Sequence, residues 1–238
     1  MPDTGEVVVR LRDVTKRYHG LRPLRVRRVD LRRGETLAFL GFDQTAAEVL
    51  VDLITGATVP DEGEVTVLGR TTTSITDGHM WLDMLDQCGV ISERAVLVEQ
   101  FTAEQNLAIA LSLDVEDMPD GVRSEVRRLA QEAGVTEAEL AQPVSVLSST
   151  ARLRIRLGRA LALGPQILLA EHPSASLTPN ETPAFAADLS DIVAKRRLAA
   201  LVLTADSTFA RAVAQQVLTL QPATGELKPA TGWRRWFS

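Results

Sequence analysis

Short, very apolar runs occur at three places in the chain, and each lies close to a segment with helical spacing. The runs are 36–40, 166–170 and 198–204. Strands that are apolar at nearly every position are buried on both faces, which is typical of parallel strands covered by helices. The alternation of such strands with helical segments therefore predicts an α/β fold built on a parallel sheet.

The rest of the chain has helix and strand signals of its own. Strand-like patterns lie at 7–11, 26–31, 64–68 and 217–220, and helical spacing lies at 46–54, 149–163 and 181–195. The stretch 94–158 is mostly helical. Within it, Pro119-Asp120-Gly121 separates two helices and Thr136 begins a third. These signals predict a group of helices inserted between the strands.

Composition places the chain among ordinary globular proteins. It has 238 residues, of which 45% are hydrophobic and 24% charged, and this excludes disordered and fibrous classes. The single cysteine, Cys88, cannot form an internal disulfide, so a reducing compartment is expected. The first residues have no basic or apolar leader pattern, and runs such as 198–203 are far shorter than the roughly 20 residues of a membrane span. We expect a protein with no span of its own.

Positive charge gathers at the start of the chain, although the net charge is −5. Residues 1–33 hold ten basic and four acidic residues. Such a segment could contact nucleic acid or lipid headgroups, but its arginines also alternate along strand-like patterns, as they do on solvated strand faces. With an isoelectric point near 5.3, the chain is not expected to bind nucleic acid.

Lysine is nearly absent from a chain with 26 basic residues, since it occurs only at positions 16, 195 and 228. Gly41 ends the run 36–40 just before a helix, where nucleotide-binding folds hold phosphates. The phosphate-binding pattern is G-x-x-x-x-G-K-[ST]. From Gly41 to Glu48 the chain has Gly-Phe-Asp-Gln-Thr-Ala-Ala-Glu, so only the first glycine matches. No shift of register restores the lysine.

Short segments on both sides of this loop follow one another in a recognisable order and spacing. They are 14–18 ending in Tyr18, 41–48, the pattern Pro60-x-x-Gly63-x-Val65-x-Val67-x-Gly69, 89–93, Leu147-Ser148-Ser149-Thr150-Ala151, 167–173, 174–178 and 203–206. Along nearly its whole length the chain resembles the ATP-binding cassette (ABC) subunits of transporters. The segments stand at that family's adenine-stacking aromatic, P-loop, hairpin, Q-loop, signature, Walker B, D-loop and H-loop.

The resemblance implies a single α/β nucleotide-binding domain over residues 1–238, a P-loop NTPase-like ABC cassette. Its parts would be a RecA-like core sheet with an antiparallel β subdomain, formed by 1–93 and 159–230, and a helical subdomain at about 94–158. A short aromatic-basic tail, 231–238, would follow.

At the nucleotide position the resemblance implies a degenerate site. Tyr18 stands where the family stacks an aromatic side chain on adenine, Ala47 at the P-loop lysine and Glu48 at the hydroxyl that binds Mg²⁺. The other residues of this position are Gly41, Gln44 and Thr45. A missing cation and an added anion would oppose phosphate binding by several kcal/mol. With the phosphate site lost, packing explains Tyr18 better than adenine binding does.

The catalytic positions depart from the family in the same way. Glu93 replaces the Q-loop glutamine, Thr178 the D-loop aspartate and Ala205 the H-loop histidine, while His172 stands at the water-orienting glutamate. A neutral imidazole can act as a base, but a base without its companions or a bound substrate does nothing. We therefore expect no autonomous ATP hydrolysis.

Glu171 keeps an acid at the Walker B aspartate. Together with Glu48 it could attract a cation, but two carboxylates without a third ligand make a weak case. We predict no metal and no cofactor at this chain's own site, with ATP and Mg²⁺ held mainly by a partner cassette.

The loop also has a structural interpretation. Thr45-Ala46-Ala47-Glu48 fits the capping box S/T-x-x-E, in which two side chains satisfy free N–H groups at a helix start. This pattern predicts that a carboxylate of the protein replaces the bound phosphate at the helix N-terminus.

The signature segment has changed less. Ser148 remains, and Ser149 and Thr150 can still cap the next helix, although both family glycines are lost. In the family this segment faces the nucleotide held by the opposite subunit. We expect Ser148, Ser149 and Thr150 to keep part of that role.

The leading hypothesis is a catalytically degenerate ABC subunit, cytoplasmic and held at the inner face of the membrane by a permease. It would pair with an active cassette, and the helical subdomain and the loop 93–101 would receive the coupling helices of the permease. The spacing of Thr102 and Asn106 resembles cassettes of lipoprotein-release or macrolide-export type. The alternatives are a soluble scaffold or regulator without a permease and an ATPase with displaced catalytic residues. The Trp233-Arg234-Arg235-Trp236-Phe237 tail suits a membrane interface or a permease groove, and a packed or disordered tail is equally compatible.

Overall fold

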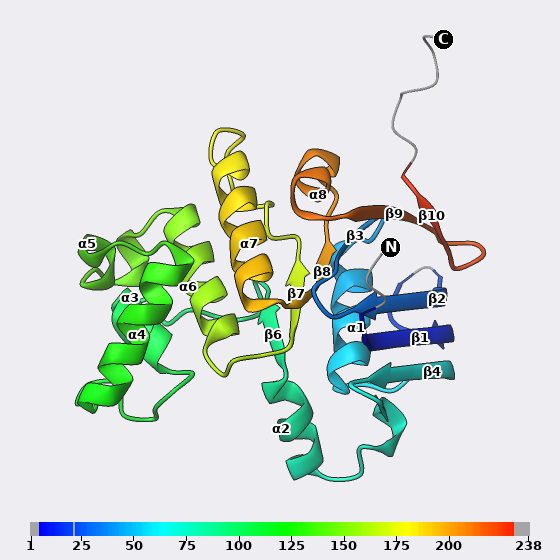
Figure 1. The fold of residues 1–238 in the computed structure, drawn as a ribbon, viewed down its shortest axis with the longest axis horizontal. Coiled ribbons are helices and arrows are strands. Elements are labelled where there is room, and N and C mark those ends of the chain that lie inside the picture. Colours follow the sequence, from blue (N-terminus) through cyan, green and yellow to red (C-terminus); the bar gives the residue numbers. More distant parts are fainter. Residues whose placement is uncertain (1–4, 21, 231–238) are drawn as a thin grey trace.

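The computed structural model describes residues 5–20 and 22–230 (Figure 1). The aromatic-basic tail predicted for 231–238 lies outside the described residues.

The main sheet has six strands in the order β10-β9-β3-β8-β7-β6. Its strands are β3 (Thr36–Leu40), β6 (Cys88–Ile91), β7 (Ile167–Glu171), β8 (Ala199–Leu203), β9 (Gln216–Gln221) and β10 (Glu226–Pro229). All neighbours are parallel except the β9–β10 pair at the edge. The predicted parallel sheet is confirmed.

The register of this sheet brings distant segments to one edge. Phe39 of β3 and Glu171 of β7 both pair with Leu203 of β8, and Ile91 of β6 pairs with Ala170. Because the carboxyl ends of parallel strands meet at the same edge, the loops that follow β3, β6, β7 and β8 are neighbours. Five of the segments that resemble family motifs, 41–48, 89–93, 167–173, 174–178 and 203–206, start or end at this edge.

A second, antiparallel sheet has the order β2-β1-β4-β5. It comprises β1 (Val7–Lys16), β2 (Leu24–Arg32), β4 (Glu62–Val67) and β5 (Arg70–Thr71). Helix α1 (Gln44–Thr55) lies between the two sheets (Figure 1). Its residues Leu50, Leu53 and Ile54 are fully buried in one apolar cluster that includes side chains of both sheets.

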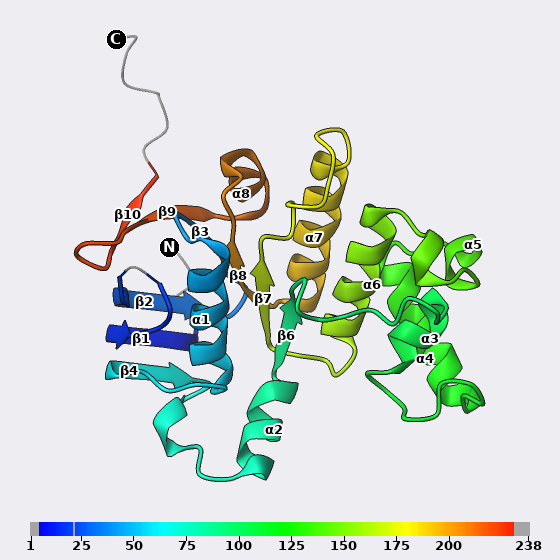
Figure 2. The same cartoon turned by 180° about the vertical axis from the view of Figure 1, so that it is seen from behind.

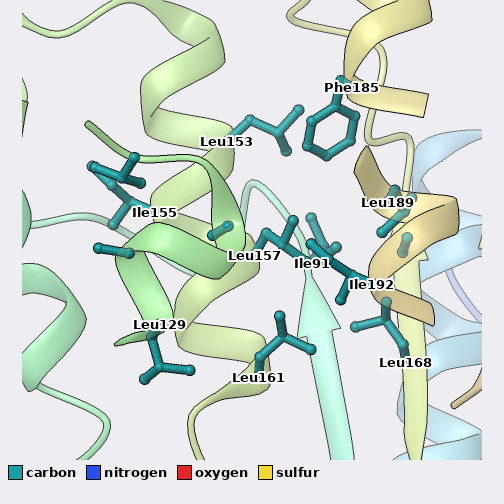
Figure 3. Packing of buried hydrophobic residues seen from close by; sticks show 14 of the residues in the cluster. Ile91, Leu129, Leu153, Ile155, Leu157, Leu161, Leu168, Phe185, Leu189 and Ile192 are labelled. Carbon is teal, nitrogen blue, oxygen red and sulfur yellow. The ribbon is translucent and has the colours of Figure 1, made fainter. Parts of the chain in front are cut away.

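Seven further helices lie in the part of the chain that the structure describes. They are α2 (Gly78–Asp86), α3 (Ala103–Ala108), α4 (Asp120–Ala133), α5 (Glu137–Leu140), α6 (Ser149–Leu161), α7 (Thr182–Arg196) and α8 (Ser207–Val213), with 3₁₀ turns η1 (Thr72–Ser74) and η2 (Val144–Val146). Helices α3 to α6 gather on the side away from the antiparallel sheet (Figure 2). In Figure 3, Leu157 of α6 lies close to Ile91 of β6 and Ile192 of α7, so apolar packing joins this group to the main sheet.

Most predicted elements are present, with ends displaced by a few residues. Thr136 caps α5, and Pro119 caps α4, which starts at Asp120. Helix α2 was not predicted, although Met80, Trp81, Met84 and Leu85 are apolar residues at helical spacing. Only Met84 of its nine residues is buried in the structure.

Candidate functional site

The start of α1 forms the first part of the site. Gly41 has φ +87°, a left-handed conformation that glycine adopts without strain. Asp43 is the N-cap, and its side chain accepts a hydrogen bond of 2.8 Å from the Ala46 N–H. A carboxylate of the chain therefore occupies the positive end of the helix.

The predicted capping box of Thr45 and Glu48 is wrong. The helix begins at Gln44, so Thr45 and Glu48 already lie within it, and Glu48 accepts a hydrogen bond of 2.8 Å from the Gln44 side-chain amide. Asp43 is the N-cap because the buried side chain of Phe42 stacks on Phe39, and this packing positions the backbone directly before Asp43. A carboxylate does cap the helix start, but Asp43 supplies it in place of Glu48; its substitution for a phosphate stays a prediction.

Ala47 stands at the lysine position and is fully buried against the apolar cluster of α1. Its side chain therefore makes no contribution to a ligand. Half-buried Glu48 stands at the hydroxyl position with its carboxylate held by Gln44.

A pocket of about 340 Å³ lies beside this helix start. Its lining includes Tyr18, Arg22, Gly41, Asp43 and Leu220. Burial, and then the negative charge of Asp43, raise the pKa of Tyr18 above its usual value. The aromatic residue and the glycine of the nucleotide position thus share a pocket, whose charged lining is Asp43, at the helix start, and the cations Arg22 and Arg25.

The end of β7 holds an ion cluster that the sequence analysis missed. The side chain of Glu171 has no exposed surface, and it accepts hydrogen bonds from the Ser92 hydroxyl and from Arg94 Nη2, the latter at 2.5 Å. Arg94 Nη1 lies 3.0 Å from Asp52 of α1. We call Ser92, Arg94, Asp52 and Glu171 the Arg94 cluster. The hydrogen bond to Glu171 raises the pKa of the Arg94 guanidinium further.

One signal in the sequence could have indicated this cluster. A glutamate at the end of a fully apolar strand needs a partner, because an unpaired buried charge is unstable. Arg94 follows Glu93 directly at the end of the neighbouring strand. Glu93 was singled out instead, yet its carboxylate is exposed and pairs with Arg156 of α6 at 2.8 Å.

The other two catalytic positions, His172 and Ala205, follow the ends of β7 and β8. His172 follows Glu171 with φ +44°, its N–H donates to the Leu203 carbonyl at 2.7 Å, and its buried Nε2 has no hydrogen-bond partner among the described residues. Ala205 is exposed beside Asp206, which caps α8. A lone imidazole with no acid to orient it is a weak general base.

The signature segment lies at the start of α6. Ser148 is the N-cap and accepts from the Ala151 N–H at 3.1 Å. Ser149 is exposed, and the Thr150 hydroxyl donates to Glu181 at 2.6 Å. The sequence analysis missed Glu181.

Glu181 also joins the signature to the D-loop position. Its second carboxylate oxygen accepts from the Thr178 hydroxyl at 2.6 Å and from the Thr178 N–H at 2.9 Å. The hydrogen bonds from Thr150 and Thr178 lower the pKa of Glu181 to about 2. We call Thr150, Thr178 and Glu181 the Glu181 bridge.

An ATP molecule with Mg²⁺, which the resemblance implies, does not fit these residues. The Asp43 carboxylate lies at the phosphate end of α1, and the Arg94 guanidinium contacts the carboxylate that would face a metal. The negative charge of Asp43 repels a phosphate, and the positive charge of Arg94 repels a metal ion. Within residues 5–20 and 22–230, no group of three or more His, Cys, Asp or Glu side chains could hold a metal ion.

A groove of about 210 Å³ lies between α2, β6 and α6. Leu85, Val90, Ala95 and Leu163 provide apolar lining, with Arg159 beside them. Burial lowers the pKa of Arg159, whose guanidinium donates to the carbonyl of exposed Val96 at 2.8 Å. No helix in the described part of the chain has the length and apolar character that crossing a membrane requires.

Comparison with known proteins gives the family to which this chain is similar. A family model described as "ABC transporter" matches residues 24–175. The methionine import ATP-binding protein MetN of Brucella abortus is 28% identical over 220 residues, which are 92% of this chain and 58% of that protein. MetN of Rhizobium johnstonii is 29% identical over 217 residues, with 91% and 59% covered. The chain thus spans less than two thirds of these relatives.

Solved structures have the same fold. The dimeric bacterial ABC transporter cassette MJ0796 matches with a TM-score of 0.77 and 21% identity over 94% of this chain and 100% of that one. CbiO1 of Clostridium perfringens, described as part of an ABC transporter complex, matches with a TM-score of 0.74 and 16% identity, with 93% and 87% covered. The predicted ABC cassette fold, with its mixed main sheet and antiparallel sheet, is confirmed.

Proposed function

The chain belongs to the ABC transporter family, and we propose that it is a catalytically degenerate nucleotide-binding subunit of a transporter. The observation that carries this proposal is that Asp43 caps the start of α1 and Arg94 contacts the buried carboxylate of Glu171. In the proposed subunit Asp43 takes the place of a phosphate and Arg94 that of a metal. Neither the P-loop nor the end of β7 therefore offers a site to MgATP.

The subunit would act by pairing with a second, catalytically active cassette on a membrane permease. Its contribution to the partner's nucleotide would come from Ser148, Ser149 and Thr150 at the start of α6. The helix N-terminus supports this role because it favours an anion. The Glu181 bridge opposes it, since the Glu181 carboxylate must move before a phosphate approaches Thr150. ATP and Mg²⁺ would be held mainly by the partner cassette.

The permease would bind at the groove beside the loop 93–101. Exposed Val96 and Leu163, at 72% and 55% exposure, border apolar lining there. An apolar patch with arginines at its rim suits a short amphipathic segment of a partner protein. Through this contact the subunit would lie at the inner face of the cell membrane.

For the direction of transport we propose import, because the curated relatives are named methionine import proteins. The export likeness at Thr102 and Asn106 has no support from those names. Both residues also have local roles: Thr102 caps α3, and fully buried Asn106 bonds the backbone of Val98.

Two measurements test the proposal. Titration of the isolated chain with ATP is expected to give no micromolar, Mg²⁺-dependent binding, and a hydrolysis assay no turnover. Such binding would contradict a closed site. Purification of the tagged chain from its native host is expected to recover a permease and a second cassette. Recovery of neither would instead support the scaffold or regulator hypothesis.

A further inference from the structure

Glu171 is a charged side chain in an environment that does not tolerate an isolated charge. It ends a strand in which every residue is buried, and its own side chain has no exposed surface. Burial of a carboxylate is unfavourable by several kcal/mol unless a cation and hydrogen bonds compensate it. The residues around Glu171 must therefore include its counterion.

Arg94 meets that requirement with both ends of its guanidinium. Nη2 and Nε contact the two oxygens of Glu171 at 2.5 and 3.3 Å, and Nη1 contacts Asp52 at 3.0 Å. Two carboxylates thus contact one cation, while the Ser92 hydroxyl donates to Glu171 and accepts from the Arg94 backbone N–H. The planar guanidinium fits such a bidentate arrangement, whereas an ammonium group does not. The Arg94 side chain is 40% exposed, so the cluster opens to solvent on one side.

The same contact fixes a loop that is held from its other side by α6. Arg152, Arg156 and Arg159 are spaced along one face of that helix and bond Glu99, Glu93 and the Val96 carbonyl, respectively. Arg94 is the loop's ionic contact with β7 and α1. The loop 92–99 is therefore fixed between α6 and the core.

We propose that Glu171, Asp52 and Ser92 form a guanidinium site occupied by the chain's own Arg94, and that this internal ligand fixes the loop 92–99 in place of a nucleotide-bound metal. The position of the loop is then independent of nucleotide. Its meaning for transport, a permease-facing loop that stays in one position, rests on the proposed function. The site itself rests on the geometry alone.

The test removes the ligand and returns it from solution. In the full chain, Arg94→Ala is expected to lower the Tm by roughly 5–10 °C and to raise amide hydrogen exchange several-fold in the loop 92–99. Guanidinium chloride at sub-denaturing millimolar concentration should restore part of both losses, whereas equal NaCl or MgCl₂ should not. Arg94→Lys keeps the positive charge but loses the planar guanidinium. Its Tm and its loop exchange should therefore lie between those of Arg94→Ala and the wild type.

Arg152→Ala is the matched control, because Arg152 of α6 makes a bidentate contact with Glu99 of the same loop, a carboxylate more exposed than that of Glu171. Its Tm is expected to fall by only about 1–2 °C, without guanidinium rescue. If Arg94→Ala does not fold, the wild type still decides the question through loop exchange with and without MgATP, which should be identical.

Three results would overturn the inference: slower loop exchange in the wild type with MgATP, equal effects of Arg94→Ala and Arg152→Ala, or rescue by MgCl₂ and not by guanidinium. Failure to recover a permease would refute the proposed function and leave the guanidinium site standing.

Discussion

The starts of α1 and α6 are two helix N-termini at the P-loop and signature positions, and each is capped by a side chain of the protein. Asp43 caps α1 and Ser148 caps α6 through the same kind of hydrogen bond. Beside α1, however, the Arg94 cluster contains the fully buried carboxylate of Glu171, whereas beside α6 the Glu181 bridge is partly exposed.

In the proposed subunit this difference corresponds to two ways of losing a ligand site. Near α1 the replacement charges Asp43 and Arg94 are exposed or partly exposed, but Arg94 compensates the fully buried carboxylate of Glu171, so removing Arg94 would leave a buried ion unpaired. Near α6 a surface carboxylate covers the helix start, and a competing anion needs only to displace it. We therefore expect changes near α1 to alter global stability and changes near α6 to alter local structure.

The largest effect should come from separating Arg94 and Glu171. Arg94→Ala is expected to lower the free energy of unfolding by about 3 kcal/mol, since it leaves Glu171 buried without its cation. Adding Glu171→Gln should recover much of this loss, giving a coupling energy of about 2 kcal/mol in a double-mutant cycle. Urea unfolding of the four proteins measures both quantities.

The Arg152–Glu99 pair provides the control cycle, with an expected coupling below about 1 kcal/mol because both side chains are partly exposed. Equal coupling energies for the Arg94–Glu171 and Arg152–Glu99 pairs would show that the buried pair stabilises the fold no more than a surface pair does.

The second effect concerns restoration of a motif residue. Ala47→Lys places a long cationic side chain at a fully buried position, so stability should fall by about 2 kcal/mol, with no gain of MgATP binding. Ala205→His restores the H-loop residue at an exposed position and should change stability little. Calorimetric titration and urea unfolding test both variants. Micromolar MgATP binding by Ala47→Lys would show that the α1 site is open after all.

Much of the fold was predictable from the sequence, because buried parallel strands and glycine-terminated helices leave local patterns. The run 36–40 and the start of α6 at Ser149 were predicted to the residue. The closure of α1 was predicted with the wrong residues, because Asp43 and Thr45 are both good caps and only the packing of Phe42 chooses between them.

The two charge clusters could not be predicted from local pattern. Arg94 and Glu171 are 77 residues apart, and Thr150 and Glu181 are 31 apart. The family motifs indicate changed positions such as Glu93, whereas the contact with Glu171 comes from the next residue, Arg94, which is not a motif position. Three-dimensional register was needed to find Arg94 and Glu181.

The third effect compares the two caps directly. Asp43→Ala and Ser148→Ala should each lower the free energy of unfolding by about 1 kcal/mol, because each leaves one helix N–H without its acceptor. Urea unfolding of both variants is the measurement. Similar losses of stability would show that the two regions differ through the surrounding charges. A much larger loss for one variant would show that they differ through the caps themselves.

The smallest effect should come from Glu181, and pH reveals it. The bridge lowers the folded-state pKa from the usual 4.5 to about 2, so its stabilisation is fully present above pH 4.5 and is lost as the pH falls from 4.5 towards 2. The urea midpoints of wild type and Glu181→Gln should therefore differ by a small constant amount above pH 4.5 and converge below it. Glu116→Gln, whose carboxylate makes no ion pair or hydrogen bond among the described residues, should match the wild type throughout. If the difference between wild type and Glu181→Gln persists as the pH approaches 2, the protonated, neutral Glu181 side chain still provides the stabilisation. The bridge would then act through packing and not through charge.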